Sequence, residues 1–303
     1  MRINKIFKNI NAIFNLFKPI SLVSADHNYK NVFLKEVKDI ESITGRNISD
    51  LKVLIMGCGY LYTDVLLMKN VAKEVVGVDV LEIFFKDGYI KLFRNYLKNN
   101  KSIISSLFNS IKKRRGIKHY YNYLESISRF KIDYNNVNLI SYSGTDIPIE
   151  SKYFDVVISN AVLEHAMDLN TFFKEIHRVT KDSGLSYHLY HNYYSFSGGH
   201  LPEIYCYKNP WGHLRGIYKT SDAQLNRVTI EQVSRIFNKY FNRCTVYHVD
   251  KRHNKKDVDS NFSYEKEDLL TKEIKTELNS YSKDILLTRA FLISGLKSFR
   301  INL

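Results

Sequence analysis

The sequence predicts an α/β fold, a doubly wound and mostly parallel sheet with helices between its strands. Short apolar segments alternate along the chain with longer amphipathic ones, which is the pattern of strand–helix–strand units. The first short segment, 53–56, is a run of four apolar residues, which indicates a strand buried on both faces. The second short segment, 75–78, ends at an acid, Asp79.

The turn after the first predicted strand, Gly57-Cys58-Gly59, indicates a nucleoside site. Its two glycines let the backbone turn tightly and approach a ligand closely. Asp79 follows about 20 residues later, the spacing at which a carboxylate ending the second strand accepts from ribose hydroxyls. A dinucleotide site requires a third small residue in this loop, so that the helix can pack closely on the strand. This chain has the bulky Tyr62 at that position. The pattern therefore disfavours NAD and FAD, and it suits S-adenosylmethionine, which has no phosphate to hold.

The rest of the chain supplies further predicted strands and helices. Strands are expected at 137–142, 154–160 and 185–189, and helices at about 30–44 and 169–181. Gly45 is expected to end the first of these helices, and a turn at 182–184 to follow the second. Residues 83–135 have a mostly helical pattern and indicate a helical insertion beside the substrate site. Their basic run, 112–115, is either a solvated face or a contact for a phosphate or an acidic glycan.

The composition bounds the class of protein. A chain of 303 residues that is 44% hydrophobic can bury a full core, and its length is that of about two domains. No apolar run approaches the roughly 20 residues that span a bilayer, and the three widely spaced cysteines form neither a disulfide framework nor a zinc pattern. A cytoplasmic location is therefore expected. The net charge of +14 favours anionic partners, unless it reflects only a coding bias toward Lys, Asn and Ile.

Residues 1–20 have the pattern of an amphipathic helix. Apolar residues spaced by three and four form one stripe, made of Ile3, Ile6, Phe7, Ile10, Ile13, Phe14 and Phe17. The charges of this segment are all positive, which is typical of a helix that lies in a membrane interface. The segment lacks the continuous apolar core and cleavage site of a signal peptide. A helix docked on its own domain or on a dimer partner is the alternative.

Several segments together resemble class I S-adenosylmethionine-dependent methyltransferases. The most specific is 154–165, which is similar to the fourth strand and following helix of the small-molecule members. Further similar segments are 53–60, 75–79, 144–148 and 178–184, with weaker similarity at 229–249 and 285–297. The resemblance implies a Rossmann-like sheet closed by an antiparallel pair. It also implies a methyltransferase domain at 46–303, with the insertion at 83–135, after a helical extension at 1–45.

The resemblance implies a role for each cofactor-binding residue. The backbone of Gly57, Cys58 and Gly59 would pass under the methionine part of the cofactor, and Asp79 would hold the ribose. The adenine would lie between Thr145 and Asp146, and Asn160 and Ala161 would line the end of the fourth strand. The chain departs from the family pattern at Ile55, where many members carry an acid, and at Leu61, which replaces a further glycine.

The loop at 190–220 indicates the acceptor. It contains the single tryptophan and several other aromatic residues that could stack on a sugar, and it resembles loops of methyltransferases among bacterial surface-glycan enzymes. A hydroxyl of a sugar or glycan precursor is therefore the expected acceptor. Two alternatives stay open. The positive charge permits an RNA methyltransferase, and the departures from the pattern permit a non-catalytic partner subunit.

Six of the ten histidines lie between His165 and His213. No closely spaced histidine pair with an acid partner appears, so no metal site is expected. The loop histidines His200, His191 and His213 are the candidates for the general base that would remove the hydroxyl proton. His200 is the first choice, because the glycines before it let the backbone approach a ligand. His188 is expected to be a buried, hydrogen-bonded strand residue.

Overall fold

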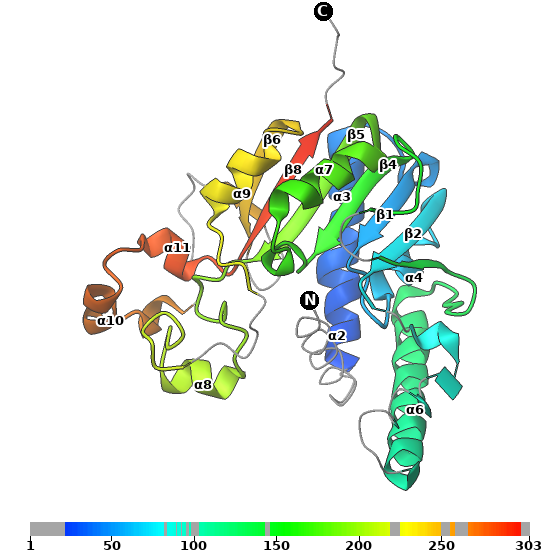
Figure 1. The fold of residues 1–303 in the computed structure, drawn as a ribbon, viewed down its shortest axis with the longest axis horizontal. Helices are drawn as coiled ribbons and strands as arrows, with labels where there is room; N and C mark the ends of the chain where they lie inside the picture. Colours follow the sequence, from blue (N-terminus) through cyan, green and yellow to red (C-terminus); the bar gives the residue numbers. More distant parts are fainter. Residues whose placement is uncertain are drawn as a thin grey trace, which may run out of the picture. The chain divides into compact units, whose positions relative to one another are not determined.

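The computed structural model describes residues 22–81, 84–88, 90–91, 93–94, 97, 103–142, 146–218, 225–249, 255–257 and 266–297, with the side chains of 103–112 and 255–257 excepted. The chain divides into two compact units, 1–143 and 144–303, whose elements are shown in Figure 1. The predicted N-terminal amphipathic helix and Thr145 lie outside the described residues. The predicted domain at 46–303, its extension at 1–45 and its insertion at 83–135 stay predictions.

The first unit is built on three parallel strands. They are β1 (Lys52–Met56), β2 (Glu74–Asp79) and β3 (Asn138–Ser141), in the order β3-β2-β1. All three strands were predicted, and β1 and β2 are buried along nearly their whole length, as their apolar runs indicated. The parallel strands place the carboxyl ends of β1 and β2 at the same edge of this unit.

The helices of the first unit begin earlier than expected. Their bounds are α2 (Leu22–Asp26), the π-helical η1 (His27–Phe33), α3 (Leu34–Thr44), η2 (Ile48–Asp50), α4 (Thr63–Met68), η3 (Phe85–Asp87) and α6 (Ile103–Ser128). The predicted helix at 30–44 thus covers the end of η1 and all of α3, within a helical run that is described from residue 22 onward. It ends as predicted, because Gly45 takes a left-handed conformation (φ 64°) and donates to the carbonyl of Glu41.

The second unit combines parallel and antiparallel strands. They are β4 (Phe154–Asn160), β5 (Thr180–His191), β6 (Asn242–Val249), β7 (Lys255–Asp257) and β8 (Ala290–Leu296), in the order β4-β5-β8-β6-β7. β4 and β5 are parallel, whereas β8 is antiparallel to both β5 and β6. The predicted antiparallel closing pair is therefore confirmed, and with it the Rossmann-like fold class.

The helices of the second unit pack on these strands and follow their ends. They are η4 (Leu163–His165), α7 (Leu169–Val179), α8 (Glu203–Lys208), α9 (Ile230–Phe237), η5 (Glu267–Leu269), α10 (Lys272–Glu277) and α11 (Lys283–Leu287). α7 contacts β5 and α9 contacts β6, and the two helices contact each other. Figure 1 shows them side by side over these strands.

The turn predicted at 182–184 lies inside β5. This strand begins at Thr180, five residues earlier than expected, and Ser183 has a left-handed φ of 62° within it. The pairing with β4 shifts register between Phe154 and Val156, so the extra residues of β5 form an irregularity rather than a turn between elements. A side chain at Gly184 would come within 2.9 Å of the carbonyl of Asp155, which explains the glycine there.

His188 is a buried strand residue, as predicted. It lies in β5 with no exposed surface, and its two ring nitrogens contact the hydroxyls of Ser159 (2.7 Å) and Ser186 (2.6 Å). The rings of Phe173 and Phe237 meet it edge to face. Burial lowers the pKa of His188 to about 3, because the charged imidazolium would lose its hydration.

The low pKa of His188 predicts acid sensitivity of the fold. The unfolded chain binds a proton at His188 below about pH 6.5, whereas the folded chain binds it only near the lowered pKa. Stability is therefore lost as the pH falls through this interval, on the order of 2 kcal/mol at pH 5. Urea unfolding at neutral pH and at pH 5 measures the loss. Between neutral pH and pH 5, the unfolding free energy of His188→Phe should fall by about 2 kcal/mol less than that of the parent protein. Equal losses in the two proteins would contradict the lowered pKa of His188.

Candidate functional site

The glycine turn of the first unit has the predicted geometry. Gly57 and Gly59 both have a φ of 67°. The amides of Gly57 and Cys58 donate to the carbonyl of Val78 at 2.8 and 3.1 Å, which joins the turn to the end of β2. A Cβ at Gly59 would meet no atom within 4 Å, so this position needs glycine for its backbone conformation and not for lack of space.

Asp79 closes the turn from the end of β2. Its Oδ2 accepts from the amide of Gly59 at 2.7 Å, and its Oδ1 accepts from the amide of Leu81 at 3.0 Å. Burial raises the pKa of Asp79, and these backbone donors oppose the rise. Each carboxylate oxygen has a further lone pair, so Asp79 can accept from two ribose hydroxyls while it holds the turn. The first unit thus brings Gly57, Cys58, Gly59 and Asp79 together, in an arrangement that fits a nucleoside.

Tyr62 occupies the position where a dinucleotide site has its third small residue. It has a left-handed φ of 37° and is fully buried, and its hydroxyl donates to the carbonyl of Tyr134 at 3.0 Å. Its ring packs against those of Phe84 and Tyr121. The loop after the glycine turn is therefore filled by an aromatic core. Ile55, one of the two departures from the family pattern, is buried in β1.

Among the described side chains of the basic run, which are those of 113–115, Lys113 is the buried one. It is only 7% exposed, and its ammonium lies 4.9 Å from the ring centroid of Tyr60, the residue after the glycine turn. Burial lowers the pKa of Lys113 to about 8. Its neighbour Arg114 lies over the ring of Phe85. The run therefore places one buried cation beside the predicted cofactor site.

Three further predicted cofactor residues, Asp146, Asn160 and Ala161, lie in the described part of the second unit. Asn160 is the last residue of β4, and Ala161 follows it with a φ of 53° and donates to the carbonyl of Leu189 in β5. Asp146 is exposed. The next residue, Ile147, is fixed by a hydrogen bond from its amide to Glu175 at 2.7 Å. Asn160 and Ala161 thus lie at the carboxyl end of β4, where parallel sheets bind ligands.

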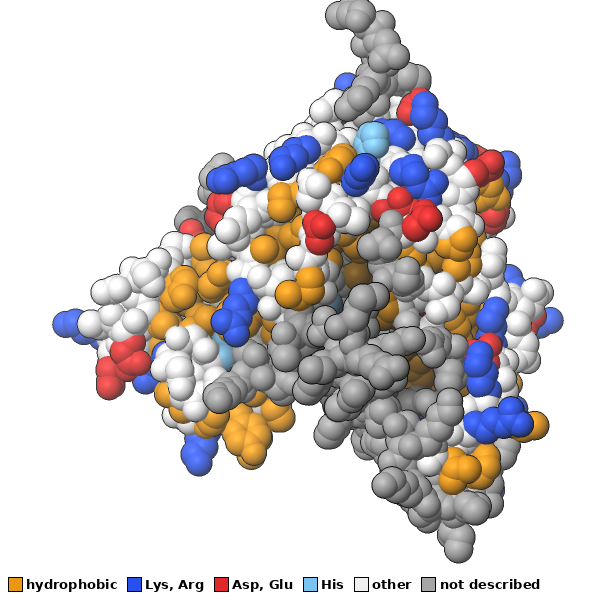
Figure 2. Space-filling view, viewed as in Figure 1, with side chains coloured by type: hydrophobic (Ala, Val, Ile, Leu, Met, Phe, Trp, Pro, Cys, Tyr) orange, Lys and Arg blue, Asp and Glu red, His pale blue; other side chains and the backbone are white. Residues whose placement is uncertain are grey.

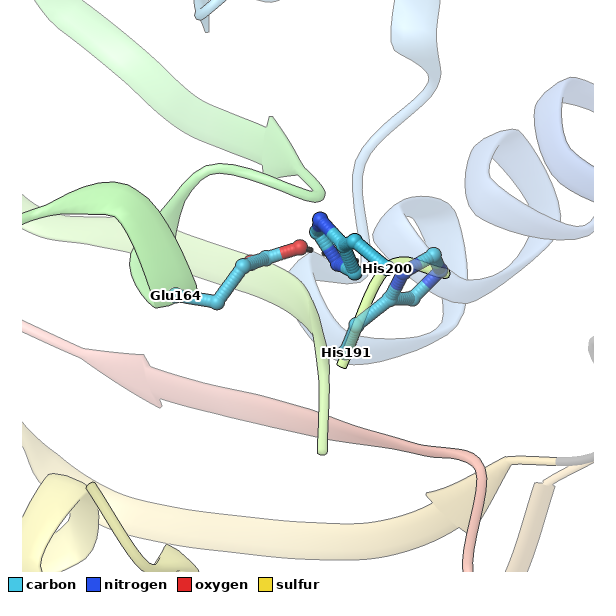
Figure 3. Close-up of side chains that lie close together, drawn as sticks. All are labelled: Glu164, His191 and His200. Carbon is cyan, nitrogen blue, oxygen red and sulfur yellow. Dashed lines mark ion pairs between the residues drawn. The ribbon is translucent and has the colours of Figure 1, made fainter. Parts of the chain in front are cut away.

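Two of the three predicted catalytic histidines meet a buried acid. Glu164 lies in η4, directly after β4, His191 ends β5, and His200 lies in the loop that follows (Figure 3). His191 Nδ1 is 3.9 Å from Glu164 Oε1, and one polar atom from each of the three side chains lies within 4.8 Å of the others. Glu164 is 2% exposed, whereas both histidines are partly exposed. We call these three residues the Glu–His–His cluster.

His213 is not part of the Glu–His–His cluster. It is buried, and its Nε2 donates to the carbonyl of Tyr193 at 2.9 Å. Burial lowers the pKa of His213. A Cβ at Gly199 would come within 2.7 Å of its ring, so this glycine lets the loop pack directly on His213. The observed contacts of His213 are those of a residue that holds the loop in place.

The expectation that Trp211 stacks on a sugar is wrong. Trp211 has no exposed surface, and its indole nitrogen donates to the carbonyl of Leu286 at 3.1 Å. It forms a core with Leu270, Ile274, Leu278, Leu286 and Leu287. The exposed aromatic side chains of this region are Tyr205 (47%) and Tyr207 (44%) on α8. Figure 2 shows hydrophobic side chains at the surface in this region.

Glu164 was not among the site residues predicted from the sequence. Its position does indicate a site residue, because Glu164 follows the fourth predicted strand and parallel sheets bind ligands at the carboxyl ends of their strands. His191 and His200 follow the next strand in the same way. Strand pairing alone could have placed an acid beside the two histidines.

Residues 116–187 match the family model described as a methyltransferase domain. The match covers the end of α6, β3, β4, α7 and β5 as far as Tyr187, and it supports the predicted enzyme class, a methyltransferase with S-adenosylmethionine as its cofactor. A search of curated proteins gives no match.

Solved structures with a similar fold include three from different organisms. The YcgJ protein of Bacillus subtilis is 17% identical, with 88% of this chain and 97% of that chain covered and a TM-score of 0.43. An S-adenosylmethionine-dependent methyltransferase of Mesorhizobium loti is 11% identical, with 86% and 96% covered and a TM-score of 0.43. Phosphoethanolamine N-methyltransferase 2 of Haemonchus contortus is 14% identical, with 89% and 54% covered and a TM-score of 0.46. These are weak similarities, all with TM-scores under 0.5.

Proposed function

We propose that the protein transfers a methyl group to a hydroxyl oxygen of a sugar or glycan precursor. The observation that supports an oxygen acceptor is the Glu–His–His cluster. A sugar hydroxyl is a poor nucleophile until it loses its proton, and an uncharged imidazole can accept that proton. His200 and His191 are the proposed catalytic residues, while His213 supports their loop.

The cofactor-binding residues have distinct proposed roles. The backbone of Gly57, Cys58 and Gly59 would support the methionine part, and Asp79 would accept from the ribose hydroxyls. The buried ammonium of Lys113, beside Tyr60, would face the carboxylate of the methionine part. Thr145 and Asp146 would flank the adenine. Asn160 and Ala161 would line the cofactor at the end of β4.

The proposed reaction is an in-line displacement. S-adenosylmethionine, when bound, supplies an electrophilic methyl group on a positively charged sulfur. The acceptor hydroxyl gives up its proton, and its oxygen then bonds to the methyl carbon while the electron pair of the carbon–sulfur bond remains on sulfur. The products are a methyl ether, S-adenosylhomocysteine and a proton. The protein contributes alignment of the reacting atoms and removal of the proton.

A sugar acceptor is supported by the exposed rings of Tyr205 and Tyr207. Both side chains are nearly half exposed on one short helix, and although the ammonium of Lys266 lies over the ring of Tyr207, the exposed part of Tyr205 offers an apolar surface to a sugar ring. RNA is the second candidate acceptor, and the net charge of +14 favours it.

Transfer of a labelled methyl group tests the acceptor class. The protein is incubated with S-adenosylmethionine labelled in its methyl group and with nucleotide sugars, lipid-linked saccharides or RNA. Label is expected in a saccharide fraction, with a rate that depends weakly on salt. Label in RNA alone, with an affinity that falls steeply as salt rises, would overturn the sugar proposal.

Residues 1–20 are proposed to bind an anionic membrane surface. Within the described part of the chain, every helix is too short or too polar to serve as a membrane span. The Ile and Phe stripe with its cationic surroundings predicts instead that the protein floats with anionic vesicles. A truncated protein that starts at residue 24 should not float with the vesicles and should stay in the bottom fraction. The membrane role would be contradicted if the full-length and truncated proteins float equally well, or if the full-length protein does not float.

A further inference from the structure

The Glu–His–His cluster has the donor atoms of a metal site. Glu164, His191 and His200 point toward one another in Figure 3, and each offers one ligand atom within 4.8 Å of the others. Glu164 is 2% exposed, and a carboxylate is rarely buried to this extent unless a cation or hydrogen-bond donors compensate its charge. The cluster therefore combines a buried carboxyl group with two imidazole rings.

The fold fixes the backbone of the three residues before any ligand binds. β4 and β5 are paired up to Asn160 and Leu189, so Glu164 and His191 follow the ends of neighbouring strands. Asn226 holds the turn that contains Glu164, because the backbone N–H of Asn226 donates to the backbone carbonyl of Glu164 at 2.8 Å. His200 has a left-handed φ of 53°, a conformation that costs energy for a residue with a side chain and that recurs at ligand sites.

The distances allow a cation with a small movement of side chains. Zinc binds nitrogen and carboxylate oxygen at about 2.0–2.2 Å, which separates tetrahedral ligands by about 3.3 Å. The ligand atoms now lie up to 4.8 Å apart. Rotation of the histidine side chains that moves their nitrogen atoms by about 1 Å would bring the ligand atoms to the zinc-binding separation. The side chain of His191 is 34% exposed, so it has freedom to rotate.

We infer that Glu164, His191 and His200 bind one divalent transition-metal ion, with zinc as the best match. Two imidazoles and one carboxylate suit zinc or iron, and three protein ligands leave positions open for a substrate, as in catalytic zinc sites. The role of the ion rests on the proposed function. In that role it binds the acceptor hydroxyl and lowers its pKa, in place of a free imidazole base.

Zinc binding to the chelator-treated full chain tests the site without any acceptor. Calorimetry with Zn²⁺ should show one site, and both Glu164→Gln and His200→Gln should weaken it by at least about 10-fold. His177→Gln, which removes a half-buried histidine of α7 outside the cluster, should leave zinc affinity unchanged. Circular dichroism confirms that each variant is folded. Absence of zinc binding by the parent protein, or equal affinity in Glu164→Gln, overturns the site.

Methyl transfer with and without the metal tests its role. Chelation should abolish transfer to a saccharide acceptor, and added Zn²⁺ should restore it. Transfer that continues at full rate after chelation overturns the metal proposal and leaves the proposed function standing. Absence of transfer to any saccharide from zinc-loaded protein contradicts the proposed function, whereas the zinc affinity measured by calorimetry is unaffected by that result.

Discussion

Asp79→Ala is expected to weaken the binding of S-adenosylhomocysteine by about 1.5–3 kcal/mol, the range for hydrogen bonds to a charged group. The carboxylate acts twice in this site. It would accept from the ribose hydroxyls, and it already holds the glycine turn through the amide of Gly59. Removing it therefore takes away ligand contacts and loosens the turn beneath the ligand. Calorimetric titration of the ligand into the parent and variant proteins measures the difference.

Two further variants separate these effects. Asp79→Asn keeps one acceptor for the amide of Gly59, so its affinity should lie between those of the parent and Asp79→Ala. Asp50→Ala removes an exposed acid of the same unit, and its affinity should match that of the parent. If Asp79→Ala binds S-adenosylhomocysteine as tightly as the parent, the end of β2 does not bind the ribose.

Glu164→Gln is expected to lower kcat for methyl transfer by about 10²–10⁴-fold, because activation of the hydroxyl is lost. The substitution keeps the shape of the side chain and removes the negative charge near His191. Affinity for S-adenosylhomocysteine should stay unchanged, since the proposed role of Glu164 concerns the acceptor. His200→Gln should show the same separation of kcat from cofactor affinity.

His177→Gln is the matched control for the cluster. His177 lies on α7, and its ring packs against Tyr240 and Phe241. Its replacement should leave kcat within about twofold of the parent value, as expected for a half-buried position outside the cluster. A Glu164→Gln protein that retains nearly full kcat would remove the cluster from catalysis.

The sequence predicted those parts of the fold that depend on local pattern. Apolar runs located every strand of the parallel part, and Gly45 located the end of α3. His188 was correctly placed in the interior, because its neighbours in the strand are apolar. The glycine turn and Asp79 were found because their spacing along the chain follows from the geometry of one strand–turn–helix–strand unit.

The features that the sequence did not reveal depend on contacts between distant segments. Trp211 is buried by residues of α10 and α11, about 60 or more positions further along the chain, and no local pattern shows that cover. Glu164 joins the two histidines only because β4 pairs with β5. Lys113 turns inward from a basic run because Tyr60 and the core of the first unit lie on its side of α6.

The atom that receives the methyl group decides whether the protein is a sugar O-methyltransferase. The protein is given S-adenosylmethionine with an isotope-labelled methyl group and a saccharide acceptor, and the product is examined by nuclear magnetic resonance and mass spectrometry. The expected product is one labelled methyl ether on a sugar oxygen, formed together with an equal amount of S-adenosylhomocysteine. Label on nitrogen, or no labelled product from a protein that binds S-adenosylhomocysteine, would contradict the proposed function.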